Sequence, residues 1–255
     1  MATGQGVDRE PRPRIHSKKG ARDRWLKVLF QPLIGLLARH PDWALGFEDE
    51  TWWSRLARPN LFAWAPNDKP LRIIEQSVAK DDPDPKALAA YGILLRLVQS
   101  DSSIPDSSIP DSSIKEEVWL RFVDGQPISS VTTQFLDWVC KRLEALGKTA
   151  LLMPWDNAPW HVSREVRTWV RDHNQRVKRE KRGVRIIACY LPIKSPWLNP
   201  WMEARFHPIE PCWVHAKRKV VEPGRLLTAK ELAERVCAHF HCQHDKHLAI
   251  PEKVA

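Results

Sequence analysis

The chain has 255 residues, enough to bury the core of one large domain with or without a tail. Its 40 Lys and Arg against 31 Asp and Glu give a formal charge of +9, which favours polyanionic partners such as nucleic acid, although a merely basic protein shows the same balance. No apolar stretch reaches the roughly 18 residues of a membrane span, the N-terminus lacks the apolar core of a secretory signal, and the five cysteines are odd in number, so we expect reduced thiols, a cytoplasmic location and no membrane partner.

The first 24 residues are predicted to form a flexible basic arm or linker. Residues 1–24 carry seven Arg and Lys and two prolines without apolar periodicity, so they are suited to touching phosphates and not to forming a core. Residues 25–250 are expected to form one domain, followed by a short tail at 251–255. The helical spacing of leucines over 25–39 predicts an amphipathic helix at the start of that domain.

Several strands are predicted in the next part of the chain. Apolar and aromatic stretches indicate strands over 43–53, 71–77, 89–97 and 118–123, and together they suggest an antiparallel meander. Asp-Ser-Ser-Ile-Pro is repeated over 101–114, and the proline in its copies excludes a central strand there. We interpret this repeat as a duplicated hairpin tip in a loop, without a functional role.

Helices and strands alternate in the second half. The predicted elements are a helix over 131–146, a strand over 149–155, a helix over 164–182, a strand over 184–190 and a final helix over 229–240. Gly147 and Gly183 are expected to end the first two helices, and Ser163 to cap the second. Thr228 and Glu231 have the spacing of a capping box at the start of the last helix. This order predicts an α/β domain whose ligands lie at the C-terminal ends of the strands.

Three short acidic motifs stand out along the chain. Asp49 lies in Phe-Glu-Asp-Glu-Thr, Asp156 in Trp-Asp-Asn-Ala-Pro-Trp-His, and Glu210 in Pro-Ile-Glu-Pro-Cys-Trp. Each carboxylate comes at the end of an apolar run or at the start of a helix. Carboxylates gathered from distant segments at one sheet edge are what a pair of divalent metals needs to hold a phosphodiester. In a basic chain, they predict cutting or joining of nucleic acid.

Asp49 has a particular place in its predicted strand. A period of two puts Phe47, Asp49 and Thr51 on one face of the sheet, with Glu48 and Glu50 on the other. A carboxylate among buried neighbours is unfavourable unless it meets a cation or a hydrogen-bond donor. The alternative interpretation is an ordinary acidic strand end.

The other two carboxylates also have plain alternatives. Asp156 occupies a position where Asp and Asn commonly cap a strand–helix turn, and His161 either orients a phosphate or water or is a simple turn residue. Glu210 beside a proline at a helix start can merely complement the helix dipole. Glu203, seven residues earlier, is a rival for its role.

Basic residues in three regions are candidates for contacts with the DNA backbone, because Lys and Arg neutralise phosphates. They are Lys178, Arg179, Lys181, Arg182, Lys194, Lys217, Arg218 and Lys219.

A group of Cys and His residues lies near the C-terminus, where zinc binding and a polar tail are both open interpretations. Its spacings match no standard zinc-finger pattern. The members are Cys237, His239, His241, Cys242, His244 and His247. The sequence has no Gly-rich phosphate loop and no Gly-x-Ser-x-Gly elbow, so nucleotide hydrolysis and triad esterase chemistry have no support.

The motifs at 46–53, 155–161, 191–200 and 209–218 closely resemble those of the bacterial transposases of the insertion-sequence-630 family. These are relatives of the mariner elements in the DDE endonuclease superfamily, and the resemblance covers residues 25–250. It implies a ribonuclease-H-like mixed sheet flanked by helices, as in the DDE and integrase catalytic cores.

The same resemblance implies an enzyme that needs Mg²⁺ or Mn²⁺ and acts in transposition and DNA recombination. It would nick insertion-sequence ends and transfer the strands to target DNA, with Asp49, Asp156 and Glu210 as catalytic metal ligands. The implied partner is double-stranded DNA, comprising transposon ends and target. We expect a homodimer, because two ends are cut, in the nucleoid-associated cytoplasm of a bacterium.

Three departures from the family pattern bear on the function. Residues 201–207 intervene before the Ile-Glu-Pro motif, so Glu203 and Glu210 both stay eligible, with Glu210 preferred for the Pro-x-Trp-x-His-x-Lys-Arg context around it. The helix-turn-helix DNA-reading domain expected upstream is absent from the sequence, and the repeat at 101–114 is irregular. The alternative is therefore a catalytically silent, truncated remnant that only binds DNA, and a nuclease for another substrate is a third interpretation.

Overall fold

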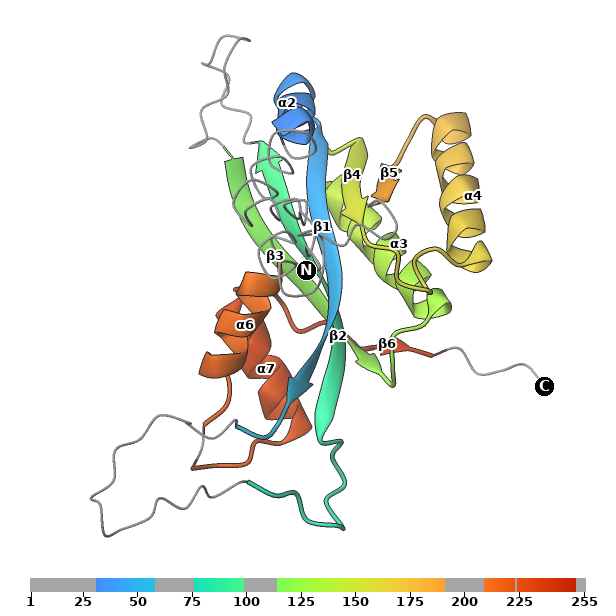
Figure 1. The fold of residues 1–255 in the computed structure, drawn as a ribbon. Coiled ribbons are helices and arrows are strands. Elements are labelled where there is room, and N and C mark those ends of the chain that lie inside the picture. Colours follow the sequence, from blue (N-terminus) through green and yellow to red (C-terminus); the bar gives the residue numbers. More distant parts are fainter. Residues whose placement is uncertain (1–30, 58–75, 99–113, 191–208, 223, 251–255) are drawn as a thin grey trace, which may run out of the picture.

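The structure is a computed structural model, and it describes residues 31–57, 76–98, 114–190, 209–222 and 224–250. A six-stranded mixed sheet runs through it in the order β5-β4-β1-β2-β3-β6 (Figure 1). The strands are β1 Trp43–Ser54, β2 Ala87–Val98, β3 Ile114–Asp124, β4 Ala150–Trp155, β5 Arg185–Tyr190 and β6 Leu248–Ala249. β1, β2 and β3 form the antiparallel meander, whereas β4 is parallel to both β1 and β5.

Helices cover both faces of this sheet. They are α2 Gln31–Arg39, α3 Ser129–Ala145, α4 Arg164–Glu180, α6 Glu210–Lys219 and α7 Ala229–His239. α3 and α4 supply the buried core of one face, and α6 and α7 that of the other, where α2 also packs (Figure 1). The predicted ribonuclease-H-like mixed sheet flanked by helices is therefore confirmed.

β1 sends its side chains alternately into the two cores. Ala44 belongs to the α3/α4 side, whereas Leu45, Phe47 and Trp53 belong to the α6/α7 side. This alternation is the expected period of two along a strand. It places Asp49 on the α6/α7 face, with Glu48 on the opposite one.

A glycine allows α6 to lie close to the sheet. Gly92 of β2 pairs with Asp49 of β1, and the ring of Trp213 from α6 lies directly over it. A Cβ atom at position 92 would come within 2.4 Å of the Trp213 Cη2 atom. Gly92 therefore sets the approach of α6 to the strand that carries Asp49.

The helix ends follow the predicted signals with one exception. The Ser163 Oγ atom accepts a hydrogen bond at the start of α4, Thr228 completes a capping box, and Gly147 after α3 has φ +73°. The expected end of the second helix at Gly183 is wrong. α4 ends at Glu180, because Lys181 already adopts the left-handed conformation with φ 52°.

Arg55 joins three segments just beyond β1. Its side chain is 3 % exposed, its Nε atom donates to the Leu227 carbonyl at 2.6 Å, and its Nη2 atom donates to Asp82 at 2.9 Å. Leu227 immediately precedes the cap of α7, and Asp82 lies in the segment leading to β2. One guanidinium therefore fixes the end of β1 against the starts of β2 and α7.

The remaining predictions fall partly outside the described residues. The predicted strand over 71–77 is not formed at residues 76 and 77, and residues 71–75 lie outside the described part, as do 1–24, 251–255 and the repeat up to residue 113. β6 was not predicted; it pairs with Val123 and Asp124 at the end of β3. No helix within the described ranges is long and apolar enough to cross a membrane.

Candidate active site

Asp49 lies partly buried on the α6/α7 face of β1. The Trp213 indole N–H donates to its Oδ2 atom at 3.0 Å. Burial, and then the negative charges of Glu50 and Glu210, raise the pKa of Asp49 to about 7, although the Trp213 hydrogen bond opposes this shift. Asp156 adds a smaller contribution in the same direction. Asp49 is thus a carboxylate crowded by like charges from other segments.

Asp156 comes directly after β4, the parallel neighbour of β1. Leu45 of β1 pairs with Leu152 of β4. Asp49 and Asp156 each follow this last ladder pair by four residues along the chain. The side chain of Asp156 is half exposed, as a group that meets a substrate has to be.

Glu210 is the first residue of α6, followed by a proline in the first turn. The helix packs on the same sheet face as Asp49, and the charge of Glu210 acts on Asp49. The structure therefore brings together carboxylates from β1, from the end of β4 and from the start of α6. Their roles as catalytic metal ligands stay a prediction. The rival Glu203 lies outside the described residues.

These three side chains suit a divalent cation. Carboxylate oxygens are hard donors of the kind that Mg²⁺ and Mn²⁺ prefer. Burial, and then the charges of Glu50, Glu210 and Asp156, raise the pKa of Asp49, and a bound cation would oppose all of these effects. The chemistry of the donors therefore fits the expected metal, but in the described part of the chain the three carboxylates are not close enough to one another to share one ion.

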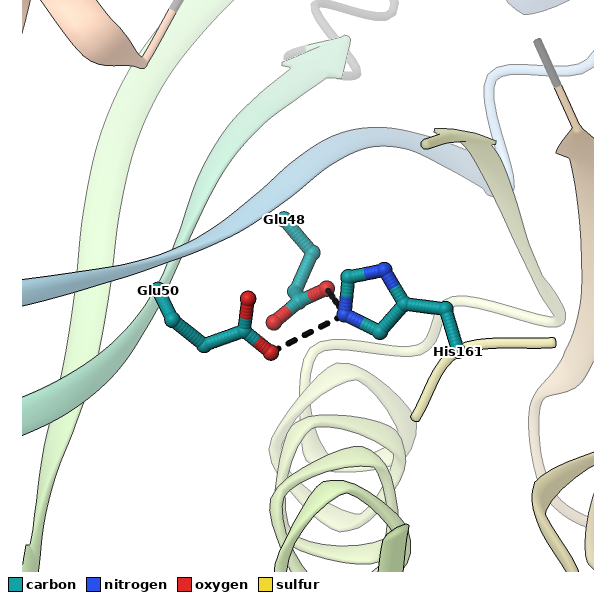
Figure 2. Close-up of side chains that lie close together, drawn as sticks. All are labelled: Glu48, Glu50 and His161. Atoms are coloured by element: carbon teal, nitrogen blue, oxygen red, sulfur yellow. Dashed lines mark hydrogen bonds and ion pairs between the residues drawn. The ribbon is translucent and has the colours of Figure 1, made fainter. Parts of the chain in front are cut away.

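His161 lies at the centre of a second cluster, on the opposite face of β1 (Figure 2). Its Nε2 atom is 2.9 Å from Glu50 Oε1 and 3.3 Å from Glu48 Oε2, and its Nδ1 atom is 2.6 Å from Asp156 Oδ1. The Trp155 indole N–H donates to Glu48, and the Trp160 indole N–H donates to Glu50 at 2.7 Å. Sequence reasoning left His161 as a turn residue or a phosphate ligand and missed these contacts with β1.

The charges in this cluster favour a protonated histidine. Burial opposes the charge on His161, but the negative charge of Glu48 and the hydrogen bonds to Asp156 and Glu50 outweigh it and raise its pKa to about 10. Burial, followed by the charge of Glu50, raises the pKa of Glu48 well above its ordinary value. An imidazolium ring that donates from both nitrogens therefore accounts for the contacts of His161 with Asp156 and Glu50, but not for the Trp160 indole N–H, which lies 3.1 Å from Nε2.

The C-terminal Cys and His residues form pairs in the structure. His244 Nε2 and His247 Nε2 are 3.2 Å apart, and His247 Nδ1 contacts Asp124. Within the described ranges, the only three Cys, His or acidic side chains close enough to share one metal ion are Glu48, Glu50 and His161. The zinc interpretation of the C-terminal group therefore gains no support.

Among the predicted DNA contacts, those on α6 lie nearest to Asp49. Lys217 donates to the Thr51 hydroxyl at 2.5 Å, on the same face of β1, and Arg218 and Lys219 are exposed. Lys194 lies outside the described residues. Lys217 thus combines a contact with the sheet and a place beside the candidate site.

The other predicted DNA contacts gather at the far end of α4. Lys178, Arg179, Lys181 and Arg182 are exposed there, and Arg182 pairs with Glu144. The 17 residues of α4 rise by about 1.5 Å each, which separates this end from Asp156 by most of the helix length.

The nearer half of α4 carries an arginine stripe that sequence reasoning missed. Arg164, Arg167 and Arg171 line one shallow pocket, and Arg167 lies over the Tyr190 ring at 5.8 Å. Their spacing of three and four residues is that of one helix face and was readable in the sequence.

The comparisons with known proteins agree with an endonuclease domain. Residues 113–233, a little under half of the chain, match the DDE superfamily endonuclease family, and this segment contains Asp156 and Glu210. No curated protein matches the chain by sequence.

Similar solved structures are transposase complexes. The Mos1 transposase paired-end complex with left transposon end is 14% identical with a TM-score of 0.49, and the match covers 96% of this chain and 60% of that one. The Mos1 strand transfer complex is 16% identical with a TM-score of 0.45 over 95% of this chain and 59% of that one. The Mos1 mariner paired-end complex with Mn is 16% identical with a TM-score of 0.45, and the match covers 96% of this chain and 61% of that one. This chain thus spans about three fifths of the length of these transposases.

Proposed function

We propose that residues 25–250 form the catalytic domain of a DDE transposase of the insertion-sequence-630 type. In this proposal the domain nicks DNA at the ends of a mobile element and transfers the strands to target DNA. The observation that carries it is the convergence of three carboxylates from β1, the end of β4 and the start of α6, where burial and the charges of Glu50, Glu210 and Asp156 raise the pKa of Asp49. The DDE endonuclease match over 113–233 supports the same reading of the last two residues.

Asp49, Asp156 and Glu210 would hold Mg²⁺ or Mn²⁺. A divalent cation there would supply Lewis-acid activation of the phosphodiester and of its nucleophile. The protein's own contribution is to fix the donors: Trp213 orients the Asp49 carboxylate through its indole N–H, and His161 does the same for Asp156. Lys217 adds positive charge beside the site for the DNA backbone.

The proposed partner is double-stranded DNA, as transposon end and as target. The chain's charge of +9 and the exposed arginines of α4 support binding to a polyanion. We further propose a homodimer, since cutting two ends takes two active sites, and a place at the bacterial nucleoid in the cytoplasm.

Nicking of supercoiled plasmid by the purified chain tests this function. We expect nicking that depends on Mg²⁺ or Mn²⁺, is abolished in Asp156→Asn, and is kept in Asp172→Asn, which removes an exposed carboxylate of α4 that pairs with Arg171. Full activity in Asp156→Asn would refute the site. Salt-sensitive DNA binding without nicking by the folded wild type would favour the silent remnant instead.

The third carboxylate is tested by a pair of substitutions. If Glu210 serves, Glu210→Gln abolishes nicking and Glu203→Gln does not. The reverse result would move the role to Glu203 and leave α6 with a purely structural residue at its start.

A further inference from the structure

We infer that His161 is the positioning residue that sets the spacing between Asp49 and Asp156 by fastening the loop after β4 to β1. This inference rests on the proposed function of these two carboxylates. It concerns a buried residue that acts through its contacts with Asp156, Glu50 and Glu48.

The backbone does not set this spacing on its own. Among the described residues, β1 pairs with β4 only from Trp43 to Leu45, which is four residues short of Asp49. β4 continues to Trp155 along β5 instead. Between the last ladder pair and the two carboxylates, β1 and β4 are therefore joined by side chains.

Those joining contacts come from the Glu48–Glu50–His161 cluster. Glu48 and Glu50 flank Asp49 in β1 and point to the opposite face, where each contacts His161 from the segment after β4. The Nε2 atom of His161 lies 2.9 Å from Glu50 (Figure 2), and its other ring nitrogen, Nδ1, lies 2.6 Å from Asp156. One ring thus connects the neighbour of the first carboxylate to the second carboxylate itself.

The ring is also fixed in orientation. His161 is 1 % exposed and stacks on the Trp155 ring, with centroids 4.3 Å apart and planes 27° from parallel. Rotation about χ2 would break the contacts at both nitrogens and is blocked by close packing. The Ala158 N–H also donates to Asp156 Oδ1 at 3.0 Å, so two donors hold the same oxygen of a side chain that is half exposed.

A metal ion bound within the cluster is the competing explanation. Glu48 Oε1 is buried without a hydrogen-bond partner, and the three side chains are close enough to share an ion. The bridge accounts for both ring nitrogens of His161 and for the contact with Asp156, whereas an ion would take only one of these nitrogens. The experiment below separates the two.

The test uses two substitutions that each keep half of the bridge. Asn at position 161 places its amide near the position of Nδ1 and reaches Asp156 only, whereas Gln reaches toward Glu50 only. Removing a group that orients a metal ligand weakens metal binding by about 10–100-fold. We expect both His161→Asn and His161→Gln to show this loss in Mn²⁺ affinity, measured by electron paramagnetic resonance of free Mn²⁺.

A matched control comes from the other buried histidine of this face. His173 contacts the Val184 carbonyl at 2.8 Å and is remote from Asp156 in the chain. His173→Asn should leave Mn²⁺ affinity unchanged even if it lowers the melting temperature. Nicking by the His161 variants should recover in part at saturating Mn²⁺, with DNA affinity unchanged, which a general loss of stability would not produce.

Glu50→Gln gives a second route if the His161 variants do not fold. The substitution keeps the size of the side chain and an oxygen for the Trp160 N–H, but it weakens the anchor of the ring. Folded His161 or Glu50 variants with wild-type Mn²⁺ affinity would overturn the inference. The inference would also be overturned if Asp49→Asn and Asp156→Asn still bound one Mn²⁺ per chain and Glu48→Gln did not. That result would place the ion in the Glu48–Glu50–His161 cluster. Failure of the wild type to bind Mn²⁺ or to nick DNA would instead refute the proposed function and the inference with it.

Discussion

Substituting Asp49 by Asn should stabilise the metal-free protein at neutral and alkaline pH. In the folded state Asp49 keeps its proton up to about pH 7, whereas its ordinary pKa is 3.8. Between these values the folded state binds more protons than the unfolded state, so the free energy of unfolding falls as pH rises. Asn resembles the protonated acid and can still accept the Trp213 hydrogen bond, so the variant escapes this loss.

The size of the effect follows from the shift in pKa. A rise from 3.8 to about 7 is about three units, and each unit corresponds to 1.36 kcal/mol, so the full difference is about 4 kcal/mol above pH 7. At pH 5 the difference in the free energy of unfolding is only about 1–2 kcal/mol, because pH 5 lies little more than one unit above the pKa of the carboxyl in the unfolded state. The advantage of Asp49→Asn should therefore grow by about 2–3 kcal/mol from pH 5 to pH 8.

Urea unfolding of both proteins in EDTA across this pH range measures the difference. Asp172→Asn is the control, since its exposed pair with Arg171 should contribute about 0–1 kcal/mol at any of these pH values. Added Mg²⁺ should raise the stability of the wild type more than that of Asp49→Asn, because only the former keeps the full set of ligands. An Asp49→Asn protein that is less stable than the wild type at pH 8 in EDTA would refute the reasoning.

Three further substitutions test the packing and the charge of the domain. Gly92→Ala puts a methyl group against the Trp213 ring and should lower the free energy of unfolding by about 1–3 kcal/mol; an unchanged urea midpoint would mean that α6 shifts freely. Arg55→Met leaves carboxylate and carbonyl partners without their donor and should lower the free energy of unfolding by about 3–5 kcal/mol. Urea unfolding measures this change, and a loss below about 1 kcal/mol would contradict a stabilising role for these contacts. Arg167→Gln should weaken DNA binding and reduce the slope of affinity against salt by about one in fluorescence anisotropy, more than Lys178→Gln at the other end of α4; equal effects would contradict a DNA path beside Asp156.

Local pattern was sufficient for the faces of β1. The period of two along a strand separates Asp49 from Glu48 and Glu50 whatever the strand pairs with, and the structure has this arrangement. The buried neighbours on the face of Asp49 also indicated that a cation or a hydrogen-bond donor had to be near, and the structure supplies the Trp213 indole N–H. Which donors they are depends on contacts between segments more than a hundred residues apart, such as Trp155 with Glu48 and His161 with Glu50.

Other features depend on tertiary packing that spacing does not encode. β6 has only two residues, and it is a strand because it pairs with β3. Two residues are too few to show the alternating hydrophobic pattern that predicts a strand. The four basic residues within 178–182 drew attention away from Arg164, Arg167 and Arg171, whose relation to the site appears once α4 is placed after Asp156. α4 ends at Glu180, before the glycine, since Lys181 adopts the left-handed conformation that was expected of Gly183.

The pairing of β6 with β3 protects the sheet from edge-to-edge aggregation. An edge strand offers unpaired N–H and C=O groups to which a foreign strand can add. β6 occupies the end of that edge at Val123 and Asp124, and the Gln134 side chain donates to the Ala249 carbonyl at 3.0 Å to hold it there. The opposite end of β3 carries three charged residues at 115–117, which also oppose strand addition. Removal of residues 248–255 would open the protected end and should favour edge-to-edge aggregation of the sheet.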